Sequence, residues 1–151
     1  ATGFLVSVLM GYAVAFLMIH HHTRFGMEET IRYYRGDAAG ATGKDADLAI
    51  HLPKPYSEIL AVTHVHIFSQ PLLVLAVGAL FFFCGVGEGA KTLAYLASVL
   101  GLIMSNAAPW LLRYVGEDFA FVYPLSNFLL MGGLIAMSIR ILVDLWRPLK
   151  T

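Results

Sequence analysis

The sequence contains few charged residues and a large excess of hydrophobic ones. Charged residues make up 13% of the 151 residues and hydrophobic residues make up 58%, whereas a soluble domain carries about a quarter charged residues. A chain of this composition cannot cover an apolar interior with a polar surface. It is therefore predicted to be an integral membrane protein rather than a soluble enzyme.

Cysteine and net charge are also nearly absent. The only cysteine is Cys84, which excludes a disulfide framework within the chain and a cysteine-ligated cluster or zinc knuckle. Ten basic residues balance ten acidic ones, so the formal net charge is zero. We expect no nucleic acid partner, because nucleic acids are bound by clustered basic surfaces.

Long hydrophobic runs recur along the chain. A bilayer core needs about 20 apolar residues per helix, and the runs at about residues 4–22, 57–84, 92–112 and 121–146 meet this requirement. The first run is expected to be a retained helix rather than a cleaved signal peptide. The last three runs are joined by short connections, which make neighbouring helices antiparallel. The predicted fold is an all-α, transmembrane, up-down four-helix bundle that forms one domain over residues 1–151.

Only the connection over residues 23–56 is long. The stretch MEETIRYYRG is predicted to form a short interfacial helix that Gly36 ends. The following AAGATGKD lacks the first glycine and the Ser/Thr of a phosphate-binding loop, so we do not interpret it as a nucleotide site. Lysines and arginines weakly favour a cytoplasmic position for this loop.

Polar side chains of all four predicted spans lie in one half of the membrane, the half next to the long loop. We call it the loop-side half. Polar groups without partners in lipid cost several kcal/mol each, so they must face one another, a ligand or water. The sequence therefore predicts a polar pocket in the loop-side half and a closely packed apolar half. These side chains are His20, His21, His22, Thr63, His64, His66, Ser69, Gln70, Ser105, Asn106, Trp110, Tyr123, Ser126 and Asn127.

Helical periodicity separates the histidines of the second span. At about 100° per residue, His64 and His66 point some 200° apart, so a regular helix cannot direct both at one metal ion. His66 shares a face with Thr63 and Gln70. Pro71 removes one backbone hydrogen bond and is expected to bend the helix beside His66.

Small residues at helical spacing predict close helix crossings in the apolar half. They occur in the third span around Gly101, in the fourth at Gly132, and along one face of the first span. That face consists of Ser7, Gly11, Ala15, Met18 and His22.

Two redox cofactors fit the histidines. A b-type haem needs two axial imidazoles from facing helices; His22 with His66 is the favoured pair, and His20 or His21 with His64 is the alternative. Arg24, Lys54 and Tyr56 would meet the propionates. A quinone or quinol instead needs hydrogen-bond donors around a flat ring. Its candidate donors are His66, Gln70, Asn106 and Tyr123, and its candidate walls are Trp110 and Phe68.

Two further interpretations remain open. Copper or zinc would use imidazole ligands, with His22 and His66 as the candidate metal-binding residues. In the other, the chain is a structural or anchor subunit that binds no cofactor and packs against larger membrane or cytochrome partners.

The stretch EILAVTHVHIFSQP, over residues 58–71, follows the pattern ELxxxTHxHxFSxP. With RFGMEETIRYYRGD it resembles small bacterial four-helix membrane proteins associated with c-type cytochromes. The resemblance implies a multi-pass protein of the bacterial inner membrane in a respiratory electron-transfer complex. Its partner would be a c-type cytochrome or an iron–sulfur protein docked on the long loop. The architecture is also similar to membrane cytochrome b subunits, although the chain lacks their longer spread of histidines.

Overall fold

The computed structural model describes residues 1–37 and 52–147, and the described part is helical without strands. The near miss to a phosphate-binding loop, residues 38–45, lies outside the described residues. A π-helical turn, η1 (Leu111–Val115), and a 3-10 turn, η2 (Glu117–Phe119), connect the last two long helices. The α-helices are α1 (Thr2–Thr23), α2 (Met27–Arg35), α3 (Tyr56–Phe82), α4 (Glu88–Trp110) and α5 (Val122–Trp146).

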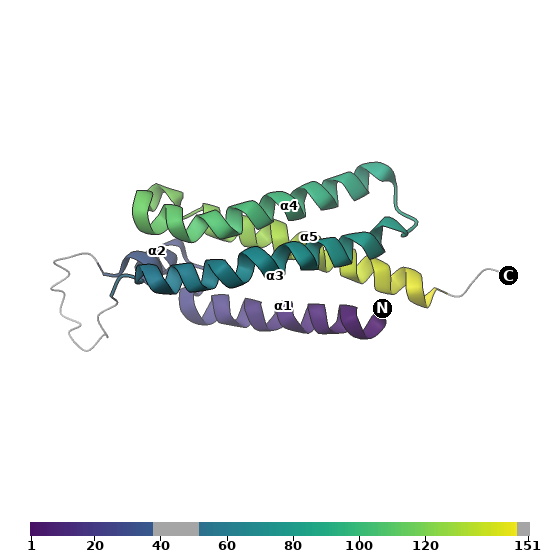
Figure 1. Cartoon of the computed structure of the whole chain (residues 1–151), viewed down its shortest axis with the longest axis horizontal. Helices are drawn as coiled ribbons and strands as arrows, with labels where there is room; N and C mark the ends of the chain where they lie inside the picture. The colour runs from purple at the N-terminus through teal and green to yellow at the C-terminus, as the bar shows by residue number, and fades with distance from the viewer. Residues whose placement is uncertain (38–51, 148–151) are drawn as a thin grey trace.

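Four helical stretches of the described residues are long and apolar enough to cross a membrane. Figure 1 shows the long helices side by side, with the start of α1 and the end of α5 at one end of the bundle and α2 at the other. The predicted all-α transmembrane bundle is confirmed, and each predicted span overlaps one of these stretches. They are Thr2–Thr23, Tyr56–Phe82, Glu88–Val115 and Glu117–Trp146.

The closest helix pair is α4 with α5. A Cβ atom added to Gly101 would lie 2.4 Å from the backbone nitrogen of Leu130, and one added to Gly133 would lie 2.4 Å from Ser98 Oγ. Glycine is thus required at Gly101 for the two backbones to approach, whereas a side chain at Gly133 would first displace the Ser98 hydroxyl. The expectation for Gly101 is confirmed. The expectation for Gly132 is wrong, since nothing lies within 4 Å of a Cβ there; its neighbour Gly133 makes the close contact.

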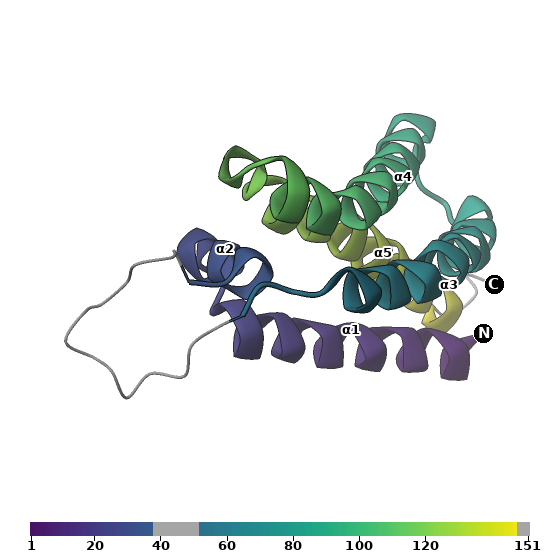
Figure 2. The same cartoon turned by 60° about the vertical axis from the view of Figure 1, so that its left-hand side comes forward.

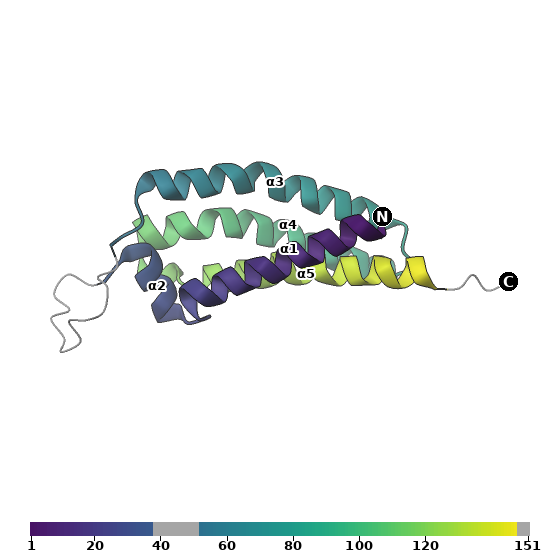
Figure 3. The ribbon, with the colours of Figure 1, turned by 90° about the horizontal axis from the view of Figure 1, so that it is seen from below.

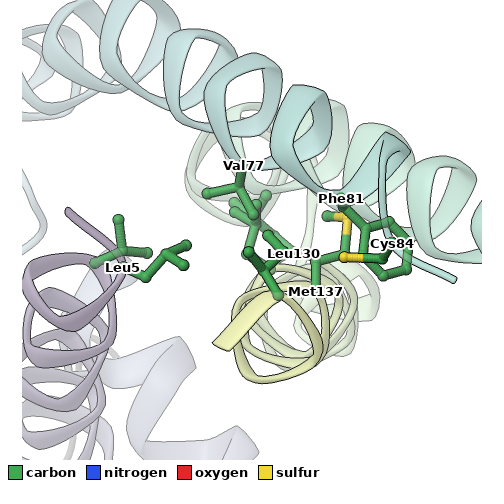
Figure 4. Packing of buried hydrophobic residues seen from close by; sticks show 9 residues of the cluster. Leu5, Val77, Phe81, Cys84, Leu130 and Met137 are labelled. Atoms are coloured by element: carbon green, nitrogen blue, oxygen red, sulfur yellow. The ribbon is translucent and has the colours of Figure 1, made fainter. Parts of the chain in front are cut away.

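A hydrophobic core joins α1, α3 and α5 in the half of the bundle away from α2. Leu5, Val77, Phe81, Leu130 and Met137 belong to it (Figure 4), and all five are almost completely buried. Tyr95 of α4 donates a hydrogen bond of 2.7 Å to the carbonyl of Gly78. The apolar half is therefore held by side chains of every long helix.

Helix α1 is less tightly held than predicted. Nothing lies within 4 Å of a Cβ placed on Gly11, so the expected close crossing at this position is wrong. Figure 3 shows α1 running obliquely to α5, its main partner among the long helices, and α3 arching over the bundle. Helix α3 continues without a break through Pro71.

The loop-side end is closed by α2, which lies where α1 ends (Figure 2). The amphipathic helix ends at Gly36, whose φ of 77° favours glycine, as predicted. Arg35 Nη1 donates to the carbonyls of Leu112, at 3.0 Å, and Arg113, at 3.4 Å. These carbonyls lie in η1, where the helix ends. Arg113 Nε donates in turn to the carbonyl of Lys54 at 3.1 Å, so α2 and the start of α3 are bound to the same turn.

At the opposite end, the predicted pair of Arg140 and Asp144 forms with an N–O distance of 2.9 Å. Asp144 also accepts a hydrogen bond of 3.3 Å from the backbone nitrogen of Gly85. The pair therefore fastens the α3–α4 turn to α5.

Gly101→Ala is expected to lower the stability of the folded bundle by about 1–3 kcal/mol, because the added methyl group would overlap backbone atoms of α5. Gly132→Ala is the matched control and is expected to be neutral or slightly stabilising, since alanine is the better helix former. Thermal unfolding in detergent micelles measures both. Equal losses in the two variants would contradict the close α4–α5 contact.

Candidate functional site

A half-open cavity of about 640 Å³ is lined by residues of all five α-helices and by Lys54. On α1 its wall extends from Phe4 to His22, a distance of roughly 27 Å at the helical rise of 1.5 Å per residue. The cavity is thus long as well as large, and it follows the helix axes.

The α1 wall is the face that the small residues predicted. Ser7, Gly11, Ala15, Met18 and His22 all line the cavity. Their grouping on one face is confirmed, but along most of its length this face borders space instead of a neighbouring backbone. The short side chains of Ser7, Gly11 and Ala15 are what leave the volume unfilled.

The α3 wall separates the two histidines of the HVH stretch. His66 and Gln70 line the cavity, one helical turn apart. His64 does not line it, and its ring lies 5.2 Å from the ring of Phe68. Thr63, which shares the predicted stripe, turns to α4 and accepts a hydrogen bond of 2.8 Å from Trp110 Nε1.

The predicted site residues divide into two groups. His22, His66, Gln70 and Tyr123 line the cavity. The others lie outside its lining: His20 is beside Phe25, His21 is beside His22, and Asn106 is behind Gln70. The cavity lining therefore omits His20, His21, His64, Asn106 and Trp110.

The loop-side end of the cavity, which we call its mouth, carries charged side chains and aromatic rings: His22, Tyr33, Tyr34, Lys54 and Glu58. Lys54 pairs with Glu58, and its Nζ lies 4.4 Å from the centre of the Tyr33 ring. The His22 ring lies 4.9 Å from the same tyrosine. Burial alone would lower the pKa of Lys54, but hydrogen bonds to Glu58 and Tyr33 raise it above its ordinary value. The mouth thus combines a firmly protonated amine with a carboxylate.

Two tyrosines of α2 belong to this mouth and were missed by the sequence interpretation. Tyr33 and Tyr34 both line the cavity, and burial raises the pKa of Tyr34 well above its ordinary value. The amphipathic pattern of MEETIRYYR indicates a helix with one apolar face, which the sequence analysis interprets as a membrane-surface helix. The sequence does not show that this helix folds back over the bundle.

The end of the cavity farther from the long loop, its deep end, is apolar and extends into the half that was predicted to be closely packed. Val8, Leu73, Leu130 and Met131 line it, and several of them also belong to the hydrophobic core. The expectation of a closely packed apolar half is therefore wrong in part. The hydrophobic core fills only some of this half, because the small residues of α1 leave part of it to the cavity.

Metal-binding side chains are not clustered in the described part of the chain. It contains no group of three or more His, Cys, Asp and Glu side chains placed to hold a metal ion. His22 and His66 come from two different helices and line the same cavity, so the pair proposed for haem does face a common space.

These features define a multi-pass helical membrane protein with a half-open, partly polar cavity between its helices. The chain belongs to the Aq_1264_TM family of transmembrane helical domains, which it matches over residues 24–151. No curated protein and no solved structure matches the chain.

Cysteine scanning tests the two faces of α3. In a Cys84→Ala background, His66→Cys should react with a water-soluble maleimide about tenfold faster than His64→Cys, because thiolate forms in a wet cavity and not in an apolar surround. Mass spectrometry of the purified protein in detergent measures both rates. The Cys84→Ala background removes the native thiol, the one cysteine of the sequence. Faster labelling at residue 64 would contradict the orientation of α3.

Proposed function

We propose that the chain is a membrane subunit of a respiratory electron-transfer complex and binds a quinone or quinol in the half-open cavity between its helices. The observation that carries this proposal is the form of the cavity. It is long, its deep end is apolar, and polar groups of α3 and the mouth line the remainder.

A quinone matches this distribution of polarity. Its flat ring carries two carbonyl oxygens, and natural quinones carry a long apolar tail. The ring would lie beside His66 and Gln70, while the tail would extend along Val8, Leu73 and Met131. A haem is a broad plate, so the length of the cavity favours the quinone.

The chemistry of the mouth is compatible with quinol oxidation. Each quinol that is oxidised releases two electrons and two protons. His66 is a suitable first proton acceptor, and Glu58 at the mouth offers a second carrier toward the loop side. The electrons would pass to a c-type cytochrome or an iron–sulfur protein docked at that side of a bacterial inner membrane.

Haem b is the second candidate, and one observation favours it. His22 and His66 are imidazoles of two helices that line a common cavity, as bis-histidine ligation requires. In this case Lys54 is the cation nearest the mouth for a propionate. Arg24 and Tyr56, the other residues expected near the propionates, do not line the cavity.

The test is to purify the protein from native membranes and quantify co-purified quinone by solvent extraction and haem by reduced-minus-oxidised spectroscopy. We expect quinone at about one molecule per chain. His66→Leu should lower its retention by about fivefold to tenfold through loss of one hydrogen bond. His64→Leu is the matched control and should retain it.

A preparation that holds haem b and loses it in His66→Leu would support the haem candidate instead. A colourless preparation without quinone, in which both leucine variants behave alike, would contradict both proposals and leave a structural subunit.

A further inference from the structure

A group of polar side chains joins α3 to α4 at the cavity wall, where Gln70 and Ser105 line the cavity and Asn106 does not. Asn106 Nδ2 donates to Gln70 Oε1 at 2.9 Å and also to the carbonyl of Leu102 at 2.9 Å. Ser105 Oγ lies 3.3 Å from the same Gln70 oxygen and 3.0 Å from the carbonyl of Leu102. These contacts lie at mid-membrane depth, because Gln70 is close to the midpoint of α3 (Tyr56–Phe82).

The chemistry of these contacts fixes the orientation of both amides. A backbone carbonyl only accepts hydrogen bonds, so Asn106 must direct its amino group toward Leu102. The same amino group reaches Gln70, which must therefore present its oxygen. Turning the Asn106 amide over would place oxygen against the Leu102 carbonyl and gain nothing, although Asn106 Oδ1 is itself buried without a partner among the described residues.

Because the Oε1 atom of Gln70 is hydrogen-bonded to α4, its Nε2 amino group remains available to the cavity. Gln70 lines that cavity, and no described residue accepts a hydrogen bond from its Nε2 atom. Gln70 is partly exposed to the cavity, and an amide donor that loses water without gaining an acceptor is costly. The two N–H bonds are therefore available to an acceptor that occupies the cavity.

We propose that Gln70 is the residue that recognises a carbonyl oxygen of the bound quinone, and that Asn106 is a positioning residue that keeps the Gln70 amino group turned toward it. This inference rests on the proposed quinone site and specifies how that site selects its ligand. The group that Gln70 selects is a hydrogen-bond acceptor, placed at mid-membrane depth one helical turn from His66.

The test compares two probes of the same shape, a 2-alkyl-1,4-naphthoquinone and the corresponding 2-alkylnaphthalene, which lacks both carbonyls. Affinities are measured by competition with a fluorescent ligand on purified protein in detergent. Wild type should prefer the quinone by about fiftyfold, the value of two net hydrogen bonds, one from His66 and one from Gln70. Gln70→Leu should reduce this preference to about fivefold to tenfold, because the His66 bond remains, with little change in naphthalene affinity.

Asn106→Leu should reduce the preference as well, although Asn106 does not line the cavity. Thr63→Val is its matched control. It also removes a hydrogen bond between α3 and α4, the one from Trp110, but it leaves the hydrogen bond between Asn106 and Gln70 in place. Thr63→Val should keep the full preference even if it lowers thermal stability to the same extent. The infrared carbonyl stretch of bound quinone gives a second readout. It should shift to higher frequency in Gln70→Leu and Asn106→Leu, and not in Thr63→Val.

An unchanged quinone preference in both Gln70→Leu and Asn106→Leu would overturn this inference while leaving a quinone-binding cavity intact. The same holds if Thr63→Val loses the preference as fully as Asn106→Leu, since the effect would then be one of helix contact alone. If wild type binds neither probe, the proposed function fails, and the role of Gln70 fails with it.

Discussion

Inside a bilayer, a polar group that finds no partner within the protein or its ligand costs several kcal/mol, and this requirement governs the arrangement of the whole bundle. Much of the polar content of the spans is satisfied locally or between helices. Ser69 and Asn127 bond to backbone carbonyls of their own helices. Trp110 bonds to Thr63 across α3 and α4. The loop-side half is therefore stabilised by hydrogen bonds as well as by apolar contact.

The apolar half is stabilised differently, and the two halves explain where the cavity lies. Gly101 and Gly133 bring the backbones of α4 and α5 together, and the core around Leu134 and Met137 fills the space beside them. Helix α1 has no such close contact at Gly11. Space therefore remains between α1 and the other helices, and it follows the face of α1 that carries its smallest side chains.

Much of this arrangement follows from the sequence, because it depends on composition and helical period alone. The spans, the end of α2 at Gly36, the Arg140–Asp144 pair and the separation of His64 from His66 are all local consequences of residue type and spacing. The roles of the small residues were not predictable in the same way. Small side chains permit either close contact or an unfilled space, and only the position of the neighbouring helix decides between them. Gly101 and Gly11 show the two outcomes. The fold of α2 over the mouth depends likewise on distant contacts, such as Arg35 with η1.

The same hydrogen-bond accounting separates structural polar residues from those that need an occupant. Asn106 and Trp110 looked like ligand-binding residues in the sequence, yet both are used to join α3 to α4. The polar groups that remain on the cavity wall include His66 and the amino group of Gln70, for which the described residues provide no hydrogen-bond partner. The oxygen of Gln70 is bonded to Asn106, but nothing in the described bundle compensates the amino group or His66 for a loss of water. The quinone that we propose would supply that partner.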